Sequence, residues 1–264
     1  MPNRPAADGI TENAVLGGRL CLRQPERGHR VGHDAILLAA ACPAGAGDKV
    51  VDLGAGVGAA GLALASRVPA ATVTLVEIDP KLAALAEENA RLNRMEGRVR
   101  AVTLDVTAPA RAFSAAGLGA DSVAQVLMNP PFNDPRRQRS SPDAARALAH
   151  TAARSVLPPW VKTAARLLRA RGRLTLIWRA DGLADVLAAL ASAFGAVAVT
   201  PVHPAPDEPA IRILITAVKA SRGPLTLLPP LVLADASGRP TPAAEAVLRE
   251  GHGIADAGSI VTMM

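Results

Sequence analysis

From Asp48 to Val218 the chain alternates between short apolar runs rich in β-branched residues and longer segments with helical periodicity. Glycine, proline or polar residues bound the short runs, and the longer segments carry apolar residues three or four positions apart. The strand-like runs cover residues 49–53, 72–78, 99–104, 123–128, 173–178, 197–202 and 211–218. The helical segments cover residues 32–41, 60–67, 80–93, 142–154, 159–170 and 183–194.

Strands that alternate with helices indicate a mainly parallel sheet with both faces covered. We therefore expect an α/β fold with a Rossmann-like, seven-stranded, mostly parallel sheet, one antiparallel strand and helices on both faces. The antiparallel strand is the last one, at 211–218. Residues 1–13 are polar and predict a loose tail, and 16–22, where two glycines precede an alternating pattern, predict a short strand or hairpin arm.

The chain shows no internal repeat and no linker long enough to require a second compact domain. An N-terminal arm and a helix over 1–45 are expected to precede one α/β domain over 46–220. The proline-rich segment over 221–264 is expected to be a C-terminal extension that packs on the same domain.

The composition indicates what the core is made of and which class of partner the chain could bind. Half of the 264 residues are apolar, but only 2% are aromatic and tyrosine is absent, so the core must consist of Ala, Val, Leu and Ile. The formal net charge of +6 favours a polyanionic partner such as nucleic acid, although the Ala- and Arg-rich composition of a genome can produce the same excess.

The remaining composition signals concern compartment and metals. Cys21 and Cys42 lack a CxxC spacing and stand in apolar stretches, so we expect buried, reduced thiols. The start of the chain does not read as a signal peptide, and the apolar runs are too short to cross a bilayer. The five histidines have no metal-ligand spacing. We therefore expect a cytoplasmic protein with no membrane span and no metal.

A glycine-rich turn is predicted where the strand 49–53 feeds the next helix. Gly54, Gly56 and Gly58 there would let the backbone turn sharply and approach a bound ligand. Asp52 directly precedes the turn, where its carboxylate could orient the ligand or a water molecule. Glu77 ends the following strand, at a position from which an acid can accept hydrogen bonds from two ribose hydroxyls. NAD enzymes share the glycine pattern, so the glycines alone do not identify the ligand.

A second motif, Asn129-Pro130-Pro131-Phe132, follows the apolar strand 123–128. The two prolines fix the backbone and remove two N–H donors. The Asn129 side-chain oxygen and the Pro130 carbonyl can then both accept hydrogen bonds from one amino group, which would aim its lone pair at a methyl donor. Phe132 could stack on a planar target. This set of groups is suited to methylating a planar amino nitrogen.

The glycine and acid pattern resembles class I S-adenosylmethionine methyltransferases, whose first motif reads Asp-x-Gly-x-Gly-x-Gly, with an acid at the end of the second strand. The resemblance implies S-adenosylmethionine as cofactor, with its methionine part against the glycine turn and its ribose on Glu77. Asp105, after the third strand, matches the acid that contacts the adenine amino group. The alternative for Asp105 is an ordinary cap at a strand end.

The Asn-Pro-Pro-Phe motif is similar to those of adenine-N6, guanine-N2 and glutamine-N5 methyltransferases. Residues 28–38, Gly-His-Arg-Val-Gly-His-Asp-Ala-Ile-Leu-Leu, resemble the block before the cofactor motif in bacterial tRNA(Val) adenine-N6 methyltransferases. That block, which includes Asp34, would cover the methionine end of the cofactor. His33 stands where the family commonly has Thr. The resemblance runs from about Leu16 into the C-terminal extension and implies methylation of an anticodon-loop adenine in tRNA.

Two basic groups are candidates for RNA phosphates. Arg136, Arg137 and Arg139 follow the Asn129–Phe132 motif directly, where a substrate backbone would approach. Lys219 and Arg222 follow the last strand. A solvated surface loop is the alternative for the first group.

Several functions stay open at this point. The acceptor could instead be guanine N2 of ribosomal RNA or N5 of a protein glutamine, because the motif requires only a planar NH2. An NAD-binding oxidoreductase would explain the glycines but leaves Asn129 to Phe132 without a role. A non-catalytic RNA-binding module is the fourth possibility, and the sequence allows either a monomer or a homodimer. Trp160 and Trp178 are interpreted as helix packing and strand core, respectively.

Overall fold

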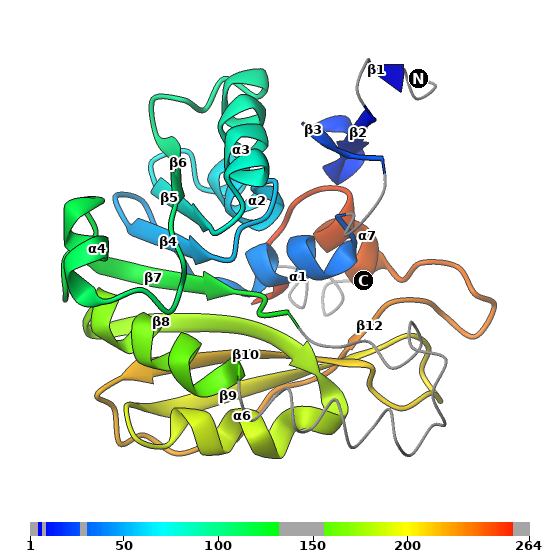
Figure 1. The fold of residues 1–264 in the computed structure, drawn as a ribbon. Helices are drawn as coiled ribbons and strands as arrows, with labels where there is room; N and C mark the ends of the chain where they lie inside the picture. Colours follow the sequence, from blue (N-terminus) through cyan, green and yellow to red (C-terminus); the bar gives the residue numbers. More distant parts are fainter. Residues whose placement is uncertain (1–4, 7–8, 27–30, 132–155, 256–264) are drawn as a thin grey trace, which may run out of the picture.

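The computed structural model describes residues 5–6, 9–26, 31–131 and 156–255 of the chain. Within them one nine-stranded sheet crosses the molecule, with helices on both faces (Figure 1). Its strands are β4 Lys49–Leu53, β5 Thr72–Glu77, β6 Val99–Thr103, β7 Val123–Met128, β8 Leu168–Arg179, β9 Phe194–His203, β10 Arg212–Lys219, β11 Thr226–Leu227 and β12 Leu231–Val232.

The seven longer strands follow the order β6-β5-β4-β7-β8-β10-β9, and β11 and β12 both pair with β9. Neighbouring strands from β6 to β8 are parallel, whereas β10 is antiparallel to both β8 and β9. This arrangement confirms the mostly parallel sheet with one antiparallel strand. The two-residue strands after Gly223 were not predicted. Because parallel strands end at the same edge of a sheet, the carboxyl ends of β4 to β7 lie side by side, where open α/β sheets bind ligands.

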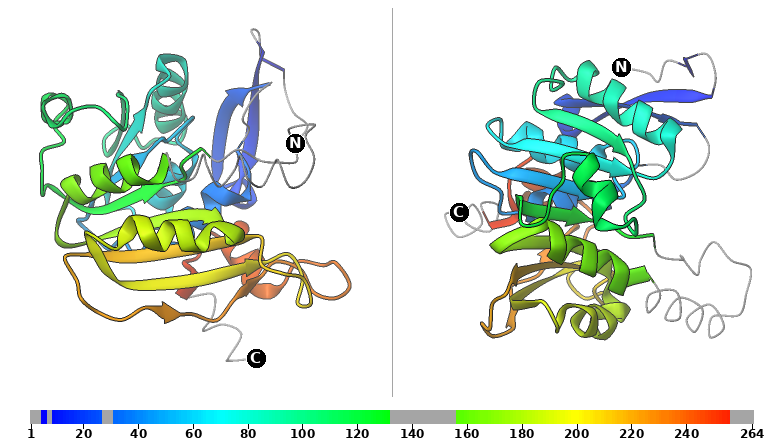
Figure 2. Two further views of the ribbon diagram at one scale, coloured as in Figure 1. Left: turned by 60° about the horizontal axis from the view of Figure 1, so that its bottom comes forward. Right: turned by 60° about the vertical axis from the view of Figure 1, so that its left-hand side comes forward.

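The sheet divides the core into two apolar clusters, and helices cover each of them. One cluster joins the sheet to α1, α2, α3 and α7, and the other joins it to α4, the helix over 156–167 and α6 (Figures 1 and 2). The bounds are α1 His33–Ala41, α2 Ala59–Arg67, α3 Pro80–Leu92, α4 Ala110–Ala115, α6 Leu183–Leu190 and α7 Pro242–Leu248, with short 3-10 turns at η1 Leu16–Gly18 and η3 Ala180–Gly182.

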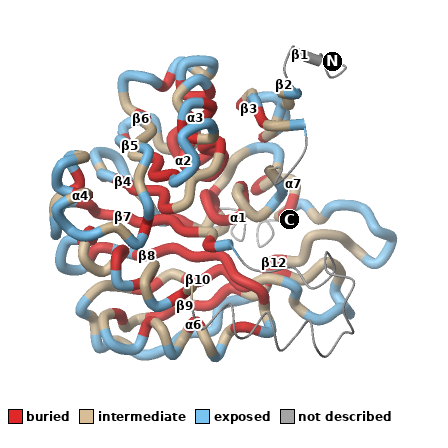
Figure 3. Tube along the Cα trace, in the orientation of Figure 1, coloured by how far each residue is buried: buried red, intermediate tan, exposed pale blue. Residues whose placement is uncertain are grey.

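Successive residues of a central strand face opposite apolar clusters. In β4, Val50 belongs to the first cluster, and Val51 and Leu53 belong to the second. The most deeply buried segments are the central strands and the helix faces against them (Figure 3). Trp178, at 2% exposed, lies in the second cluster, as its interpretation as strand core predicted.

Helices α3 and α7 each begin with a side-chain cap. The Asp79 carboxylate accepts a hydrogen bond from the Lys81 amide at 2.8 Å, and Pro80 occupies the first turn of α3, where a proline is tolerated. Its expected start at residue 80 is confirmed. Thr241 caps α7 in the same way, and Pro242 follows it.

The N-terminal arm forms a separate three-stranded antiparallel sheet of β1 Pro5–Ala6, β2 Ile10–Val15 and β3 Leu20–Pro25. The expected loose tail over 1–13 is therefore wrong for residues 10–13, which pair with β3. The hairpin arm expected over 16–22 is present, as η1 and the start of β3. Leu20 and Leu22 are fully buried in the first cluster, so the hairpin contributes to the core.

Two helices end earlier than their periodicity indicates. The segment expected as a helix over 159–170 is helical over 156–167, and β8 begins at Leu168, which pairs with Val123. The helix expected over 183–194 ends at Leu190, and Phe194 begins β9. Strand pairing outweighs helix propensity at both places. The helix expected over 142–154 lies outside the described residues. None of the helices in the described part of the chain has the length and hydropathy needed to cross a membrane.

Replacing Thr241 should loosen the C-terminal segment. Its hydroxyl accepts from the Ala244 amide at 3.1 Å and donates to the Val232 carbonyl at 2.7 Å, so it caps α7 and joins it to β12. We expect Thr241→Val to lower the free energy of unfolding by about 1 kcal/mol, measured by urea denaturation. Thr241→Ser keeps the hydroxyl and should lose less. Equal stability of Thr241→Val and the wild type would contradict the cap.

Candidate active site

Four predicted site features lie at one edge of the sheet. The glycine turn follows β4, Glu77 ends β5, Asp105 follows β6 and Asn129 follows β7. The sheet order β7-β4-β5-β6 makes these strands immediate neighbours. The structure thus brings together residues that are separated by up to 75 positions in the sequence.

The glycine turn holds a backbone shape that suits glycine. Gly54, Gly56 and Gly58 have φ values of 70°, 57° and 88°, in the left-handed region. The Gly54 and Ala55 amides donate to the Val76 carbonyl at 2.8 and 2.9 Å, which ties the turn to the end of β5. A Cβ at Gly56 would meet no described atom within 4 Å. The turn therefore presents an open backbone at Gly56, where a ligand could approach closely.

Glu77 is bonded to this turn. It is 7% exposed, and its carboxylate accepts from the Gly56 amide at 2.8 Å and from the Asp79 amide at 3.0 Å. A carboxylate has about four acceptor positions, so two remain for ribose hydroxyls. Ile78, the next residue, is 62% exposed, which leaves an apolar surface beside that acid. These features fit a nucleoside, and Ile78 was not singled out from the sequence.

Asp52 lies beneath the turn and is 2% exposed. Its carboxylate accepts from the Gly61 amide in the first turn of α2 at 2.9 Å. The pKa of this carboxyl is raised to about 7, chiefly because the group is buried; the Gly61 hydrogen bond lowers the pKa, and the nearby Glu77 raises it. Asp52 therefore caps α2 and, through this bond, links the end of β4 to the helix that follows the glycine turn.

Asp105 lies on an exposed turn. Its Oδ1 accepts from the Thr107 amide at 2.7 Å and from the Thr107 hydroxyl at 2.8 Å. Its backbone carbonyl accepts from the Ala108 amide at 3.0 Å. This is a strand-end cap that also fixes the carboxylate at the same edge as Glu77.

Asn129 carries the least satisfied polar group at this edge. Its Oδ1 is buried and has no hydrogen-bond partner among the described residues. A buried acceptor without a donor is uncommon and costs about 1–3 kcal/mol. Pro130 is buried and Pro131 is exposed, while Phe132, Arg136, Arg137 and Arg139 lie outside the described residues. Within the described residues this acceptor therefore lacks a donor, and a substrate could bring one.

Asp34 is engaged elsewhere on the same edge. Its Oδ2 accepts from Nε of Arg212 at 3.0 Å, and both side chains are about a quarter exposed. This ion pair joins the start of α1 to the start of β10. Arg179, opposite Arg212 in the strand register, binds both oxygens of Asp181 at 2.9 and 2.8 Å.

The structure does not bring Lys219 and Arg222 to this edge. Because β10 is antiparallel, Lys219 at its end lies beside the amino ends of β7 and β8. Its ammonium donates to Asp121 and to the Leu168 carbonyl, both at 2.6 Å. Arg222 follows three residues later, so both side chains are on the edge opposite Asn129.

Trp160 has a position that its interpretation as helix packing did not include. A Cβ placed on Gly54 would collide with the indole ring of Trp160, so this half-buried ring lies directly against the glycine turn. Glycine at 54 is therefore required for packing as well as for φ. The scarcity of aromatic residues was the one signal that could have drawn attention to Trp160.

Comparisons with known proteins agree with this fold. Residues 29–202 match the methyltransferase small domain family. A solved structure from Agrobacterium tumefaciens, described as a predicted O-methyltransferase, is 34% identical with a TM-score of 0.70, covering 83% of this chain and 97% of that one.

The curated relatives match a smaller share of the chain. Proteins of Porphyromonas gingivalis and Tolumonas auensis named tRNA1(Val) (adenine(37)-N6)-methyltransferase are 32% and 30% identical to the chain over 161 and 167 residues. The matched segments are 60% and 63% of this chain and 61% and 65% of those proteins, so the chain spans less than two thirds of their length.

The fold and these matches define the class of S-adenosylmethionine-dependent methyltransferases for this chain. Within that class, the chain belongs to the methyltransferase small domain family, which matches it over more than half of its length. The cofactor expected from the glycines and acids is thereby confirmed.

Ionisation of Asp52 should make stability depend on pH. Its pKa is about 7 in the folded chain against an ordinary value of 3.8, so the folded chain retains this proton to higher pH than the unfolded chain. The stabilisation is complete below pH of about 4 and is lost as pH rises through about 7. Asp52→Asn cannot ionise and can still accept from Gly61.

Urea denaturation between pH 4 and 8 measures this effect. The free energy of unfolding of Asp52→Asn should rise relative to the wild type by up to about 4 kcal/mol across that window. Glu96→Gln, the same kind of change at an exposed position, serves as the control. A difference between Asp52→Asn and the wild type that does not change with pH would contradict the buried carboxyl.

Proposed function

We propose that the chain transfers a methyl group to the N6 amino nitrogen of an adenine in tRNA. The observation that carries the proposal is the buried Oδ1 of Asn129 at the carboxyl end of β7, which has no hydrogen-bond partner within the described part of the chain. An exocyclic amino group is a donor that would satisfy this oxygen.

The chemistry needs positioning more than proton transfer. S-adenosylmethionine supplies an electrophilic methyl group on a sulfonium centre. The Asn129 oxygen and the Pro130 carbonyl would each accept one proton of the amino group, which holds its nitrogen lone pair toward the methyl carbon. Such alignment is worth a large part of a rate enhancement. The amino group loses a proton during or after transfer, so no strong base is required.

The same argument favours nitrogen over oxygen as acceptor. A hydroxyl group must give up its only proton to become a good nucleophile, and the amide of Asn129 is not a base that could take it. An amino group has two protons and keeps one after methylation. This supports an N-methyltransferase, although the Agrobacterium tumefaciens structure is described as a predicted O-methyltransferase.

Adenine in tRNA is the substrate best supported among planar amines. The names of the curated relatives specify adenine N6 in tRNA1(Val), and the net charge of +6 suits a polyanion. Guanine N2 and glutamine N5 present a similar NH2 to Asn129 and remain outcomes of the substrate test.

Cofactor contacts are assigned within the same proposal. Glu77 accepts from the ribose hydroxyls, Asp105 from the adenine amino group, and Ile78 packs against the adenine ring. Gly54, Gly56 and Gly58 shape the turn that Asp52 supports. Asp34 is proposed to lie near the methionine end, with its carboxylate already held by Arg212.

The substrate test offers total tRNA, ribosomal RNA and protein with labelled S-adenosylmethionine, followed by identification of the labelled product. N6-methyladenosine in tRNA is expected. Label in N2-methylguanosine, in N5-methylglutamine or in a methylated hydroxyl would overturn the proposal. Single-site substitution of adenines in the anticodon loop of a tRNA transcript then locates the modified position.

Changing Asn129 tests the catalytic assignment. Asn129→Ala removes the acceptor oxygen, and we expect methyl transfer to fall by at least about 100-fold, a loss of about 2.7 kcal/mol in transition-state stabilisation. Calorimetry should show nearly unchanged cofactor affinity. Asn129→Asp keeps an acceptor oxygen and should retain more activity than Asn129→Ala. Full activity of Asn129→Ala would favour a different catalytic group or a non-catalytic RNA-binding role.

Substitutions can distinguish the contributions of the two groups of basic residues to RNA binding. Neutralising Arg136, Arg137 and Arg139 to Gln should weaken tRNA binding and reduce the slope of log affinity against log salt, because fewer counterions are released. The double variant Lys219→Gln and Arg222→Gln changes charge on the opposite edge. If only this second variant changes affinity and slope, RNA approaches from the other edge.

A further inference from the structure

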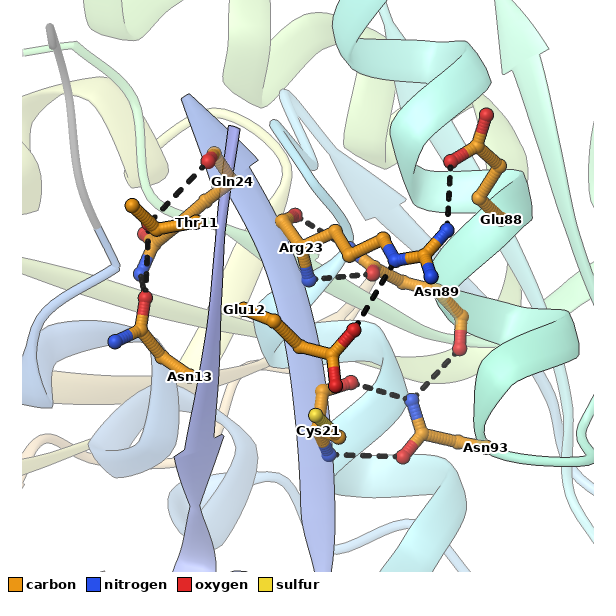
Figure 4. Close-up of polar contacts among 9 residues, drawn as sticks. All are labelled: Thr11, Glu12, Asn13, Cys21, Arg23, Gln24, Glu88, Asn89 and Asn93. Carbon is orange, nitrogen blue, oxygen red and sulfur yellow. Dashed lines mark hydrogen bonds and ion pairs between the residues drawn. The ribbon is translucent and has the colours of Figure 1, made fainter. Parts of the chain in front are cut away.

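Helix α3 holds the N-terminal hairpin by two asparagine side chains. Asn93 accepts from the Cys21 amide at 2.9 Å and donates to the Cys21 carbonyl at 2.7 Å. Asn89 accepts from the Arg23 amide at 2.7 Å and donates to the Arg23 carbonyl at 2.9 Å. Figure 4 shows both amides facing the same edge of β3. Each side chain therefore pairs with a strand residue as a neighbouring strand would.

The spacing of the two asparagines explains the fit. Residues four apart on a helix are separated by about 6 Å along its axis. Residues two apart on a strand are separated by about 6.8 Å. The two spacings nearly match, so Asn89 lies opposite Arg23 while Asn93 lies opposite Cys21.

Asn89 differs from Asn93 in the acceptor of its second N–H group. Nδ2 of Asn89 also donates to the carbonyl of Val57 at 3.0 Å, inside the glycine turn between Gly56 and Gly58. The corresponding second bond of Asn93 goes to the Asn89 carbonyl of its own helix, at 2.7 Å. Asn89 is fully buried, and its bond to the Val57 carbonyl is buried as well, whereas its bond to the Arg23 carbonyl is only partly buried.

We propose that Asn89 is a positioning residue that couples docking of the β2–β3 hairpin to the shape of the cofactor turn. Holding the Val57 carbonyl fixes the peptide plane between Val57 and Gly58. The Gly58 amide closes the turn on the Ala55 carbonyl at 2.9 Å, and the neighbouring Gly56 amide binds Glu77. A hairpin that docks on Asn89 thus stabilises the turn conformation that receives the cofactor.

The hairpin also contacts the segment that leads into α1. Gln24 is 3% exposed, and its side chain accepts from the Val31 amide at 2.9 Å and donates to Asn13 at 2.8 Å. Val31 leads directly into α1. Gln24 therefore contacts the segment before α1 directly, and the adjacent Arg23 is linked to the glycine turn through Asn89.

The salt bridges of Arg23 do not carry this coupling. Its guanidinium lies 3.2 Å from Glu12 and 3.7 Å from Glu88, with all three side chains 41–47% exposed. Exposed pairs of this kind contribute little. The buried amide of Asn89 is the connection that reaches the turn.

The matched pair Asn89→Ala and Asn93→Ala tests the proposal. Both remove two hairpin bonds, but only Asn89→Ala removes the bond to Val57. Titration calorimetry with S-adenosylhomocysteine should show about tenfold weaker affinity for Asn89→Ala and a change within about twofold for Asn93→Ala. In steady-state assays the KM for S-adenosylmethionine should rise for Asn89→Ala while kcat changes less. Equal affinities, or equal losses in both variants, would overturn the coupling.

Hydrogen exchange on the wild-type chain tests the same coupling without a substitution. Coupling between two sites is reciprocal, so a bound cofactor must stabilise hairpin docking at Asn89. S-adenosylhomocysteine should slow exchange of the Arg23 amide, which binds Asn89, more than that of the Cys21 amide, which binds Asn93. Equal slowing of both amides, or none, would contradict the proposal even if Asn89→Ala does not fold.

Discussion

The hydrogen bond between the Gly61 amide and the buried carboxylate of Asp52 joins the first long strand of the sheet to the helix that follows it. The helix has no side chain at its own N-cap, because that residue is Gly58, so a donor of its first turn is satisfied from the preceding strand. The turn between them is thereby set against β5 and can bind Glu77. The other groups proposed to bind the cofactor lie at the same edge of the sheet as that turn.

Sequence pattern predicts the buried parallel strands best. Strands 49–53 and 123–128 have the predicted bounds because their apolar runs end abruptly at glycine or at Asn-Pro-Pro. The pairing of Asp34 with Arg212, 178 residues apart, has no local signal. The side of the sheet on which Lys219 lies depends on the direction of β10, and a basic residue after a strand does not reveal that direction.

The same limit explains Trp160 and Asn89. Each reads as an ordinary helix residue, one apolar and one polar, and their contacts with the glycine turn arise only when separate helices pack around β4. Periodicity predicts which side of a helix is buried, but it does not predict which backbone atom a buried amide meets. The sequence motifs therefore located the groups that we propose to face the cofactor, while the groups that contact the glycine turn came from the fold.

The pairing of α3 with β3 has a consequence for how the molecules behave toward one another. The outer edge of a strand normally offers unpaired amides and carbonyls to which a strand from another chain can add. At Cys21 and Arg23 these groups are already bound by Asn93 and Asn89. The helix thus protects the projecting hairpin from edge-to-edge association, and loss of either asparagine would expose a site for aggregation.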